Sequence, residues 1–253
     1  MSRTEWSPSA IRRRFPGDRY VAYHAPRYSM MLTLMKRYVP PPGGRILDIG
    51  GSKLSALIHQ TFSVTVDTLD LGPDGPRPYG VNFNFDLNQA QWEDRWRADL
   101  LRYDLVVMAE VIEHLHTAPE RVLRFVRSVM NERAILILQT PNAVSLHKRV
   151  KMLAGRNPYE LIREDATDPG HFREYTRREL FAGVTRAGFT IERWLPGHYF
   201  DYSRPERARF RRPLGIAANV LYRWMPASLQ PGQTLVARSG GVNPLTPSQP
   251  RPG

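Results

Sequence analysis

Residues 44–57 read GRILDIGGSKLSAL and contain the features that decide the fold. A short apolar run ends in Asp48-Ile49-Gly50, which predicts a buried strand that stops at a glycine turn. The residues that follow, LSALIHQ, have the pattern of a helix. A strand, a glycine turn and a helix in this order build the ligand-binding corner of a doubly wound sheet. The stretch therefore predicts an α/β fold with a ligand at the turn.

Apolar strands and amphipathic helices alternate through the rest of the chain. Further strands are expected at 63–72, 79–87, 103–110, 133–140, 189–195 and 233–239, and helices at 19–39, 54–60, 118–130 and 177–188. Strands that are apolar on both faces are typical of a parallel sheet covered by helices on each side. We expect a Rossmann-like, seven-stranded, mostly parallel sheet with helices on both faces.

The segments outside this pattern suggest a domain organisation. Residues 1–18 are expected to be a flexible basic arm, 19–239 the folded domain, and the Gly/Pro/Ser-rich stretch 240–253 a disordered tail. Residues 143–175 are expected to be irregular. Thr176 and Glu179 have the spacing of a capping box, and Gly188 should end that helix. Residues 197–230 are expected to be an insertion.

Composition limits the partners and the chemistry. The chain has 253 residues, a net charge of +12 and no cysteine. The missing cysteine excludes disulfides, a thiolate nucleophile and cysteine-ligated metals. The charge favours nucleic acid, acidic lipid or an anionic substrate, with a general use of arginine as the alternative. No run is long and apolar enough to span a membrane, and residues 1–18 lack the apolar core of a signal peptide, so a cytoplasmic protein is expected.

Acidic residues, rather than further glycines, surround the turn. The dinucleotide fingerprint needs glycine at 50, 52 and 55, but only Gly50 matches, so an oxidoreductase is not favoured. Asp48 precedes the turn, Asp67 and Asp70 lie at the end of the next strand, and Asp86 ends the third. A carboxylate at the turn would repel a pyrophosphate and suits a cationic ligand. The acid after the second strand could accept the hydroxyls of a ribose.

These motifs together resemble those of the class I S-adenosylmethionine-dependent methyltransferases over residues 19–239. LDIGGS, DTLD, FDL, YDLVVMAEVIEHL and AILILQTPN match the motifs in order, and GHFREYTRRELFAGVTRAGFTIERW is similar to the branch that includes ubiquinone-biosynthesis O-methyltransferases. The resemblance implies S-adenosyl-L-methionine as cofactor and an antiparallel last strand at 233–239. Ser52 and Leu54 stand where the family has further glycines, which leaves a non-catalytic relict fold as one alternative.

The resemblance also implies a role for each site residue. Asp48 would take the ammonium through water or backbone; Gly50, Gly51 and Ser52 would line the methionine and ribose. Asp70, or Asp67 if the strand ends sooner, would hold the ribose hydroxyls. Asp86 and the Leu87 amide would read the adenine, and Ala109 and Glu110 would close the pocket.

The segment AEVIEHLH and a later histidine are the candidate catalytic groups. His114 has a suitable intrinsic pKa for a general base, with Glu113 and His171 beside it; helix bracing is the alternative role. The acceptor is expected to be a hydroxyl of a small molecule, glycan or lipid-linked precursor, with no metal. Glu110, Glu113, His114 and His171 also resemble the metal-binding set of small-RNA 2′-O-methyltransferases, so a metal-dependent RNA enzyme is the other alternative.

Residues 204–226 place arginines before an apolar stretch. The stretch could be a helix packed on the sheet, a lid over the acceptor, or an interfacial helix on an anionic membrane.

Overall fold

The computed structural model of the chain describes residues 6–165, 169–204 and 212–240. The expected tail and three arginines of the basic stretch, Arg207, Arg209 and Arg211, lie outside these ranges. The helices are α1 (Pro8–Arg14), α2 (Arg19–Met35), α3 (Lys53–Phe62), α4 (Pro119–Ser128), α5 (Leu146–Leu153), α6 (Arg177–Arg186) and α7 (Arg212–Arg223). The strands are β1 (Arg45–Ile49), β2 (Thr65–Asp70), β3 (Gly75–Arg77), β4 (Gly80–Asn84), β5 (Tyr103–Ala109), β6 (Met130–Pro141), β7 (Phe189–Gly197) and β8 (Gly232–Ser239).

The strands form one sheet in the order β3-β4-β2-β1-β5-β6-β8-β7. β4, β2, β1, β5 and β6 run parallel, and β8 runs antiparallel between β6 and β7, as expected for the last strand. The expected sheet is therefore confirmed with one addition, because the described residues form eight strands. The extra strand β3 makes an antiparallel hairpin with β4. It contains Pro76, which an edge strand tolerates.

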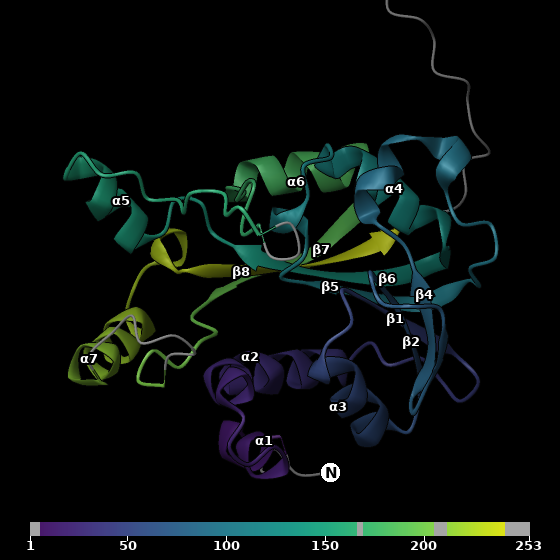
Figure 1. Cartoon of the computed structure of the whole chain (residues 1–253), viewed down its shortest axis with the longest axis horizontal. Coiled ribbons are helices and arrows are strands. Elements are labelled where there is room, and N and C mark those ends of the chain that lie inside the picture. The colour runs from purple at the N-terminus through teal and green to yellow at the C-terminus, as the bar shows by residue number, and fades with distance from the viewer. Residues whose placement is uncertain (1–5, 166–168, 205–211, 241–253) are drawn as a thin grey trace, which may run out of the picture.

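Helices cover both faces of the sheet (Figure 1). α4 and α6 lie on one face, and α1, α2 and α3 lie on the other. Side chains of each strand alternate between the two cores: Leu47 and Ile49 of β1 enter the first, and Ile46 enters the second. This alternation follows from the two-residue period of a strand and explains why the central strands are apolar throughout.

Two segments expected to lack regular structure each contain a helix. Within the expected arm, Trp6 and Ile11 are buried, and α1 packs against α2, so the part from residue 6 onward is not a loose arm. The stretch 143–175 contains α5, whose Leu146, Val150 and Leu153 recur at helical spacing. The capping box of Thr176 and Glu179 is present, and Gly188 ends α6 with a φ of +89°.

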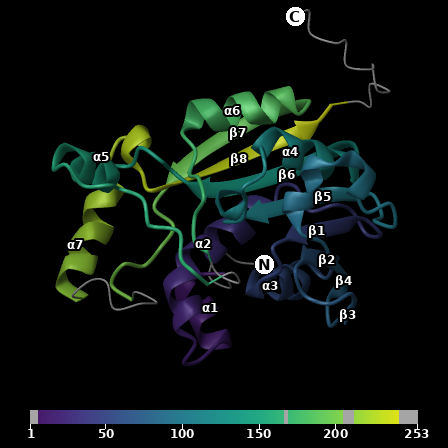
Figure 2. The same ribbon diagram turned by 45° about the horizontal axis from the view of Figure 1, so that its top comes forward.

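The ends of the parallel strands place α5 and α7 at one end of the molecule. β6 leads into α5, and the segment after β7 leads into α7, so both helices lie beyond the carboxyl edge of the sheet (Figure 2). The turn after β1 opens at the same edge. Within the described residues no helix is long and apolar enough to cross a membrane.

Candidate active site

The turn after β1 needs glycine at two adjacent positions. Gly50 and Gly51 have φ values of +93° and +32°. A Cβ on Gly51 would come within 2.2 Å of Asp70 Oδ2, and one on Gly50 within 2.5 Å of Val111 Cγ2. Both positions therefore combine a left-handed backbone with close packing.

The two glycines missing from the family pattern are not required by this backbone. Ser52 has an extended conformation with φ of −139° and caps α3, where its side chain accepts from the Leu54 amide. Leu54 lies in the helix and is buried in the core. A serine at the N-cap satisfies an orphan helix donor, so the substitutions leave the shape of the turn intact.

Asp48 is buried at the end of β1, directly below the turn. Its Oδ2 accepts a hydrogen bond of 2.6 Å from Ser55 Oγ. Burial raises the pKa of the Asp48 carboxyl from 3.8 to about 7, although the Ser55 hydrogen bond and the charge of Arg27 lower it. A cation placed beside this carboxylate would favour its ionised form.

The structure separates the roles of Asp67 and Asp70. Asp67 is buried within the sheet, where it pairs with Arg45 at 2.6 Å and accepts from Tyr103 Oη and the Val81 amide. These contacts occupy both of its oxygens. Asp70 ends β2, and its Oδ1 accepts from the Gly72 amide and Asn82 Nδ2 while Oδ2 faces Gly51. Asp70 is therefore the acid beside the turn.

The other predicted pocket residues also lie at the carboxyl edge. Asp86 follows β4 and caps a short 3₁₀ helix (Leu87–Gln91) by accepting from the Asn88 amide. Ala109 ends β5. Glu110 follows with a φ of +59°, a left-handed conformation that is unusual for glutamate and typical of functional sites. Burial raises the pKa of Glu110, opposed by the positive charges of Arg27 and Lys148.

Arg27, which lies on the buried face of α2, was not predicted from the sequence as a site residue. Only 2% of its surface is exposed, and its Nε and Nη1 find no hydrogen-bond partner among the described residues. Oε1 of Glu110 is likewise buried and unpartnered within the described ranges. A buried guanidinium with unpaired donors is costly unless a ligand pairs with it. The signal was present in the sequence as polar residues, His24 and Arg27, among the apolar positions of a helix.

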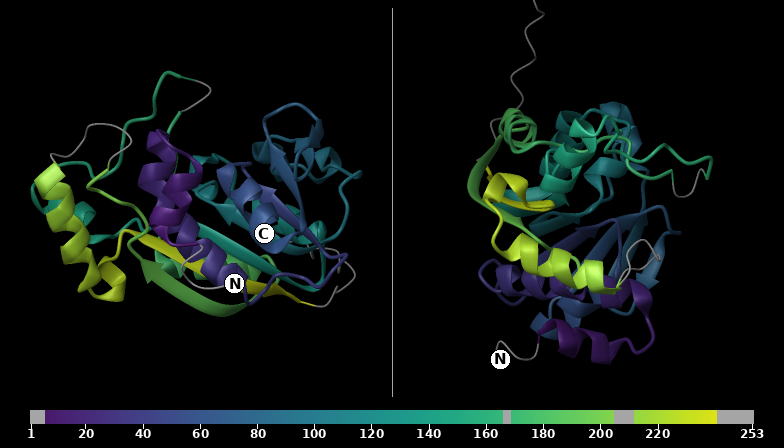
Figure 3. Two further views of the ribbon diagram at one scale, coloured as in Figure 1. Left: turned by 90° about the horizontal axis from the view of Figure 1, so that it is seen from below. Right: turned by 90° about the vertical axis from the view of Figure 1, so that its left-hand side faces the viewer.

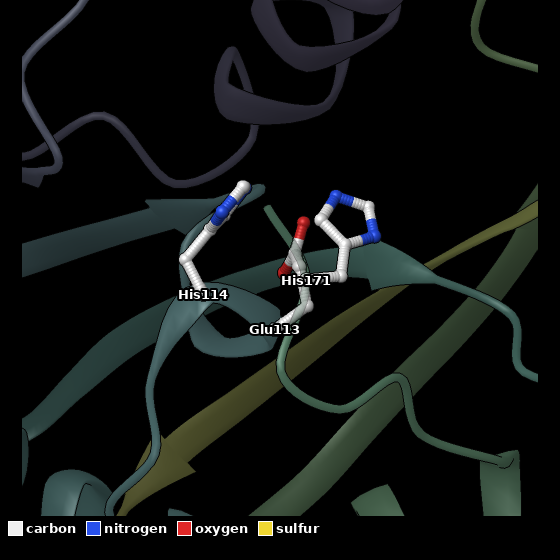
Figure 4. Close-up of side chains that lie close together, drawn as sticks. All are labelled: Glu113, His114 and His171. Carbon is white, nitrogen blue, oxygen red and sulfur yellow. The ribbon is translucent and has the colours of Figure 1, made fainter. Parts of the chain in front are cut away.

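The three candidate catalytic residues lie together (Figure 4). Each of Glu113, His114 and His171 offers one ligand atom, and these atoms lie within 4.8 Å of one another. Glu113 and His114 belong to a 3₁₀ turn after β5 (Ile112–His114), and His171 comes from the segment between α5 and α6. A carboxylate and two imidazoles could hold a divalent cation. Glu110, expected as a fourth member, is not part of this group.

Hydrogen bonds fix the two imidazole rings. His114 Nδ1 lies 2.9 Å from the Gly170 carbonyl, which can only accept, so Nδ1 carries a proton, and in the neutral ring Nε2 then holds the lone pair. His171 Nδ1 lies 3.1 Å from Glu174 Oε1. Burial lowers the pKa of His171 to about 4, helped by the nearby His114. Glu113 Oε2 accepts from Thr140, and burial, together with the charge of Glu110, raises its pKa well above the usual range.

A cavity of about 690 Å³ adjoins this group and is lined in part by His171, Phe172, Glu174, Tyr159, Leu161 and Ile162. Lys148 of α5, a second residue not predicted from the sequence, forms a buried ion pair with Glu174 and donates to the Asn142 carbonyl at 3.1 Å. Burial lowers the pKa of Lys148 to about 8. The lysine therefore links α5 to the wall of the cavity.

Comparisons with known proteins agree with this geometry. A family model described as a methyltransferase domain matches residues 22–193. A search of curated proteins finds no match. Among solved structures, the chain is similar to an S-adenosylmethionine-dependent methyltransferase from Archaeoglobus fulgidus (15% identity, 90% of this chain and 97% of the other, TM-score 0.52). It is also similar to a Haloferax volcanii methyltransferase solved in complex with the Trm112 activator (12% identity, 96% and 99%, TM-score 0.59).

These structural likenesses concern the fold, and the family match concerns the activity. Neither favours the RNA-directed or the non-catalytic alternative. The chain therefore belongs to the methyltransferase-domain family, whose Rossmann-like fold implies S-adenosylmethionine as the cofactor.

Proposed function

We propose that this protein transfers the methyl group of S-adenosylmethionine to a hydroxyl of a small molecule, glycan or lipid-linked precursor. The observation that carries the proposal is the buried guanidinium of Arg27, which has two nitrogens without a partner among the described residues and lies close enough to Asp48 and Glu110 for its charge to lower the pKa of both carboxyls. A ligand with a carboxylate, an ammonium and a ribose would offer a partner to Arg27, Asp48 and Asp70 respectively. The chemistry of these residues therefore fits this cofactor.

Each residue of the turn region has a role in this proposal. Arg27 binds the methionine carboxylate, and Asp48 receives the ammonium through water or backbone. Asp70 holds the ribose hydroxyls, because the oxygens of Asp67 are already engaged. The remaining contacts come from residues that follow β1, β4 and β5, namely Gly50, Gly51, Ser52, Asp86, Leu87, Ala109 and Glu110.

The cofactor supplies an activated methyl group, so the protein mainly aligns the acceptor and excludes water. A hydroxyl acceptor keeps its proton near neutral pH and needs a base. We assign that role to His114, whose Nε2 carries the lone pair when Nδ1 donates to Gly170 O. Glu113 and His171 orient the acceptor, which enters from the cavity beside His171.

The resemblance to the branch with ubiquinone-biosynthesis O-methyltransferases supports transfer to oxygen. The proposal assigns Glu113, His114 and His171 to the acceptor rather than to a metal ion. The proposed compartment is the cytoplasm, with peripheral contact to an anionic membrane surface. Nucleic acid is not favoured as a partner.

Calorimetric titration with S-adenosylhomocysteine tests the donor site, with NADH as the control ligand. We expect micromolar binding of S-adenosylhomocysteine, none of NADH, and the same affinity with EDTA or with added Mg²⁺ or Mn²⁺. Hydroxyl acceptors are then screened with a methyl-labelled donor, again with and without EDTA. Failure to bind S-adenosylhomocysteine under every condition contradicts the proposal. Turnover that needs added metal contradicts only the assignment of the three residues.

A further inference from the structure

α5 and α7 both project beyond the carboxyl edge of the sheet, at the same end of the molecule (Figure 3). Tyr222 Oη of α7 lies 3.2 Å from His147 Nδ1 of α5, so the two helices are in contact. Their outer faces carry large apolar side chains that solvent reaches. We call this set the α5–α7 surface; its members are Val150, Met152, Leu153, Leu214, Ile216, Val220, Leu221 and Trp224.

The apolar side chains on the outer face of α7 are exposed although the inner face of the helix is well packed. The inner face of α7 packs closely: a Cβ on Gly215 would lie 2.0 Å from the Tyr202 carbonyl, and Asn219 contacts His198 and Asp201. Tyr222 is buried on the same face. The outer face is apolar as well; Trp224, directly after α7, is 84% exposed, and on α5 Leu153 is 89% exposed. A helix that is apolar on both faces needs a second contact.

The charged residues within the two helices and the stretches next to them have one sign. Residues 142–159 and 212–239 contain no aspartate or glutamate. The exposed charged residues among them include Arg149, Lys151, Arg156 and Arg223. Exposed apolar side chains together with exposed lysine and arginine on the same segments are the pattern of a surface that lies in the interface of an anionic bilayer. A nucleic acid would use the charge but would leave the aliphatic side chains in water.

We propose that the α5–α7 surface docks the protein onto an anionic lipid bilayer. The aliphatic side chains and Trp224 enter the interface, and the basic side chains contact the headgroups. The cavity beside His171 is lined in part by Leu161 and Ile162. Both side chains are exposed and belong to the segment that follows α5. If the proposed function holds, docking brings this cavity to the membrane, and the acceptor is lipid-linked. The docking itself does not depend on the activity.

Vesicle co-sedimentation of the full chain tests the docking. Wild-type protein is expected to bind vesicles of phosphatidylcholine with one third phosphatidylglycerol and to bind pure phosphatidylcholine at least tenfold more weakly. The double variant Leu153→Glu with Trp224→Glu should lose at least tenfold in affinity. The charge variant Arg149→Glu with Lys151→Glu should lose a similar factor, and more at low salt than at high salt.

The matched control is Leu101→Glu, which replaces an exposed leucine before β5, at the opposite edge of the sheet. It should bind vesicles like wild type. S-adenosylhomocysteine affinity and circular dichroism show whether each variant is folded. If wild-type protein failed to bind S-adenosylhomocysteine, the proposed function would be contradicted, but the docking would not. Unchanged vesicle binding of the double variant overturns the docking. The docking is also overturned if light scattering shows that the wild-type protein is a dimer and the double variant is a monomer.

Discussion

His114 and His171 meet edge to face, with ring centroids 4.7 Å apart, although they come from distant segments of the chain. The amides of Phe172 and Arg173 both donate to the backbone carbonyl of Glu113, at 2.8 and 3.2 Å. The turn after β5 is thereby clamped to the segment before α6. The positions of His114 and His171 therefore depend on backbone contacts between these two segments as well as on their own side-chain contacts.

Replacing His114 should separate catalysis from cofactor binding. We expect His114→Gln to lower turnover by about 10²- to 10⁴-fold, the usual contribution of a general base, while S-adenosylhomocysteine affinity stays within about twofold. His116→Gln, in an exposed histidine two residues later, is the matched control. Methyl-transfer assays with the identified acceptor check this. Equal turnover of both variants would remove His114 from the mechanism.

Replacing Arg27 should weaken the binding of ligands that carry a carboxylate. A charge-assisted hydrogen bond contributes about 1.5–3 kcal/mol, so Arg27→Gln should reduce S-adenosylhomocysteine affinity by at least about tenfold. Adenosine, which lacks the carboxylate, should bind both proteins equally. Arg37→Gln, in an exposed arginine just beyond α2, is the control. A parallel loss of adenosine binding would show a general disturbance of the pocket instead.

Asp67 and Asp70 should differ in what their removal affects. Asp67→Asn disturbs a buried network with Arg45, Tyr103 and the Val81 amide, so the free energy of unfolding should fall by about 1–3 kcal/mol. Asp70→Asn should weaken S-adenosylhomocysteine binding at least about tenfold with a smaller change in stability. Urea denaturation and calorimetry measure the two effects. The reverse pattern would assign the ribose to Asp67.

The buried carboxyl of Asp48 should make stability depend on pH. Its folded-state pKa is raised from 3.8 to about 7, so the folded protein keeps a proton that the unfolded chain releases. The free energy of unfolding should therefore fall as the pH rises from about 4 to 7, with a slope of about 1.4 kcal/mol per pH unit within that window. Asp48→Asn cannot ionise.

Urea titrations at pH 5 and pH 7.5 compare the two proteins without cofactor. Relative to wild type, Asp48→Asn should gain stability on going to pH 7.5. His24, whose burial lowers its pKa to about 2, remains in both proteins and drops out of the comparison. Parallel pH profiles would show that Asp48 is ionised in the folded protein well below pH 7.

Local sequence determines the elements of this fold. The apolar run before Gly50, the capping box of Thr176 and Glu179, and the turn of Gly50 and Gly51 act through neighbours in the chain. The strand at Gly75–Arg77 was missed because its pairing with β4 outweighs the turn preference of its proline. The helix α5 was missed because a single short helix between irregular segments gives a weak periodic signal.

Tertiary structure decides which of the candidate residues act together. The sequence by itself determined the doubly wound architecture and placed acids after the first strands, because period and turn chemistry are local. Only the folded chain buries the guanidinium of Arg27 at the sheet edge, engages Asp67 within the sheet, and brings His171 to His114. It also leaves the outer face of α7 exposed. These outcomes depend on which surfaces meet across the sheet edge, and a side chain's neighbours in space are not encoded by its neighbours in sequence.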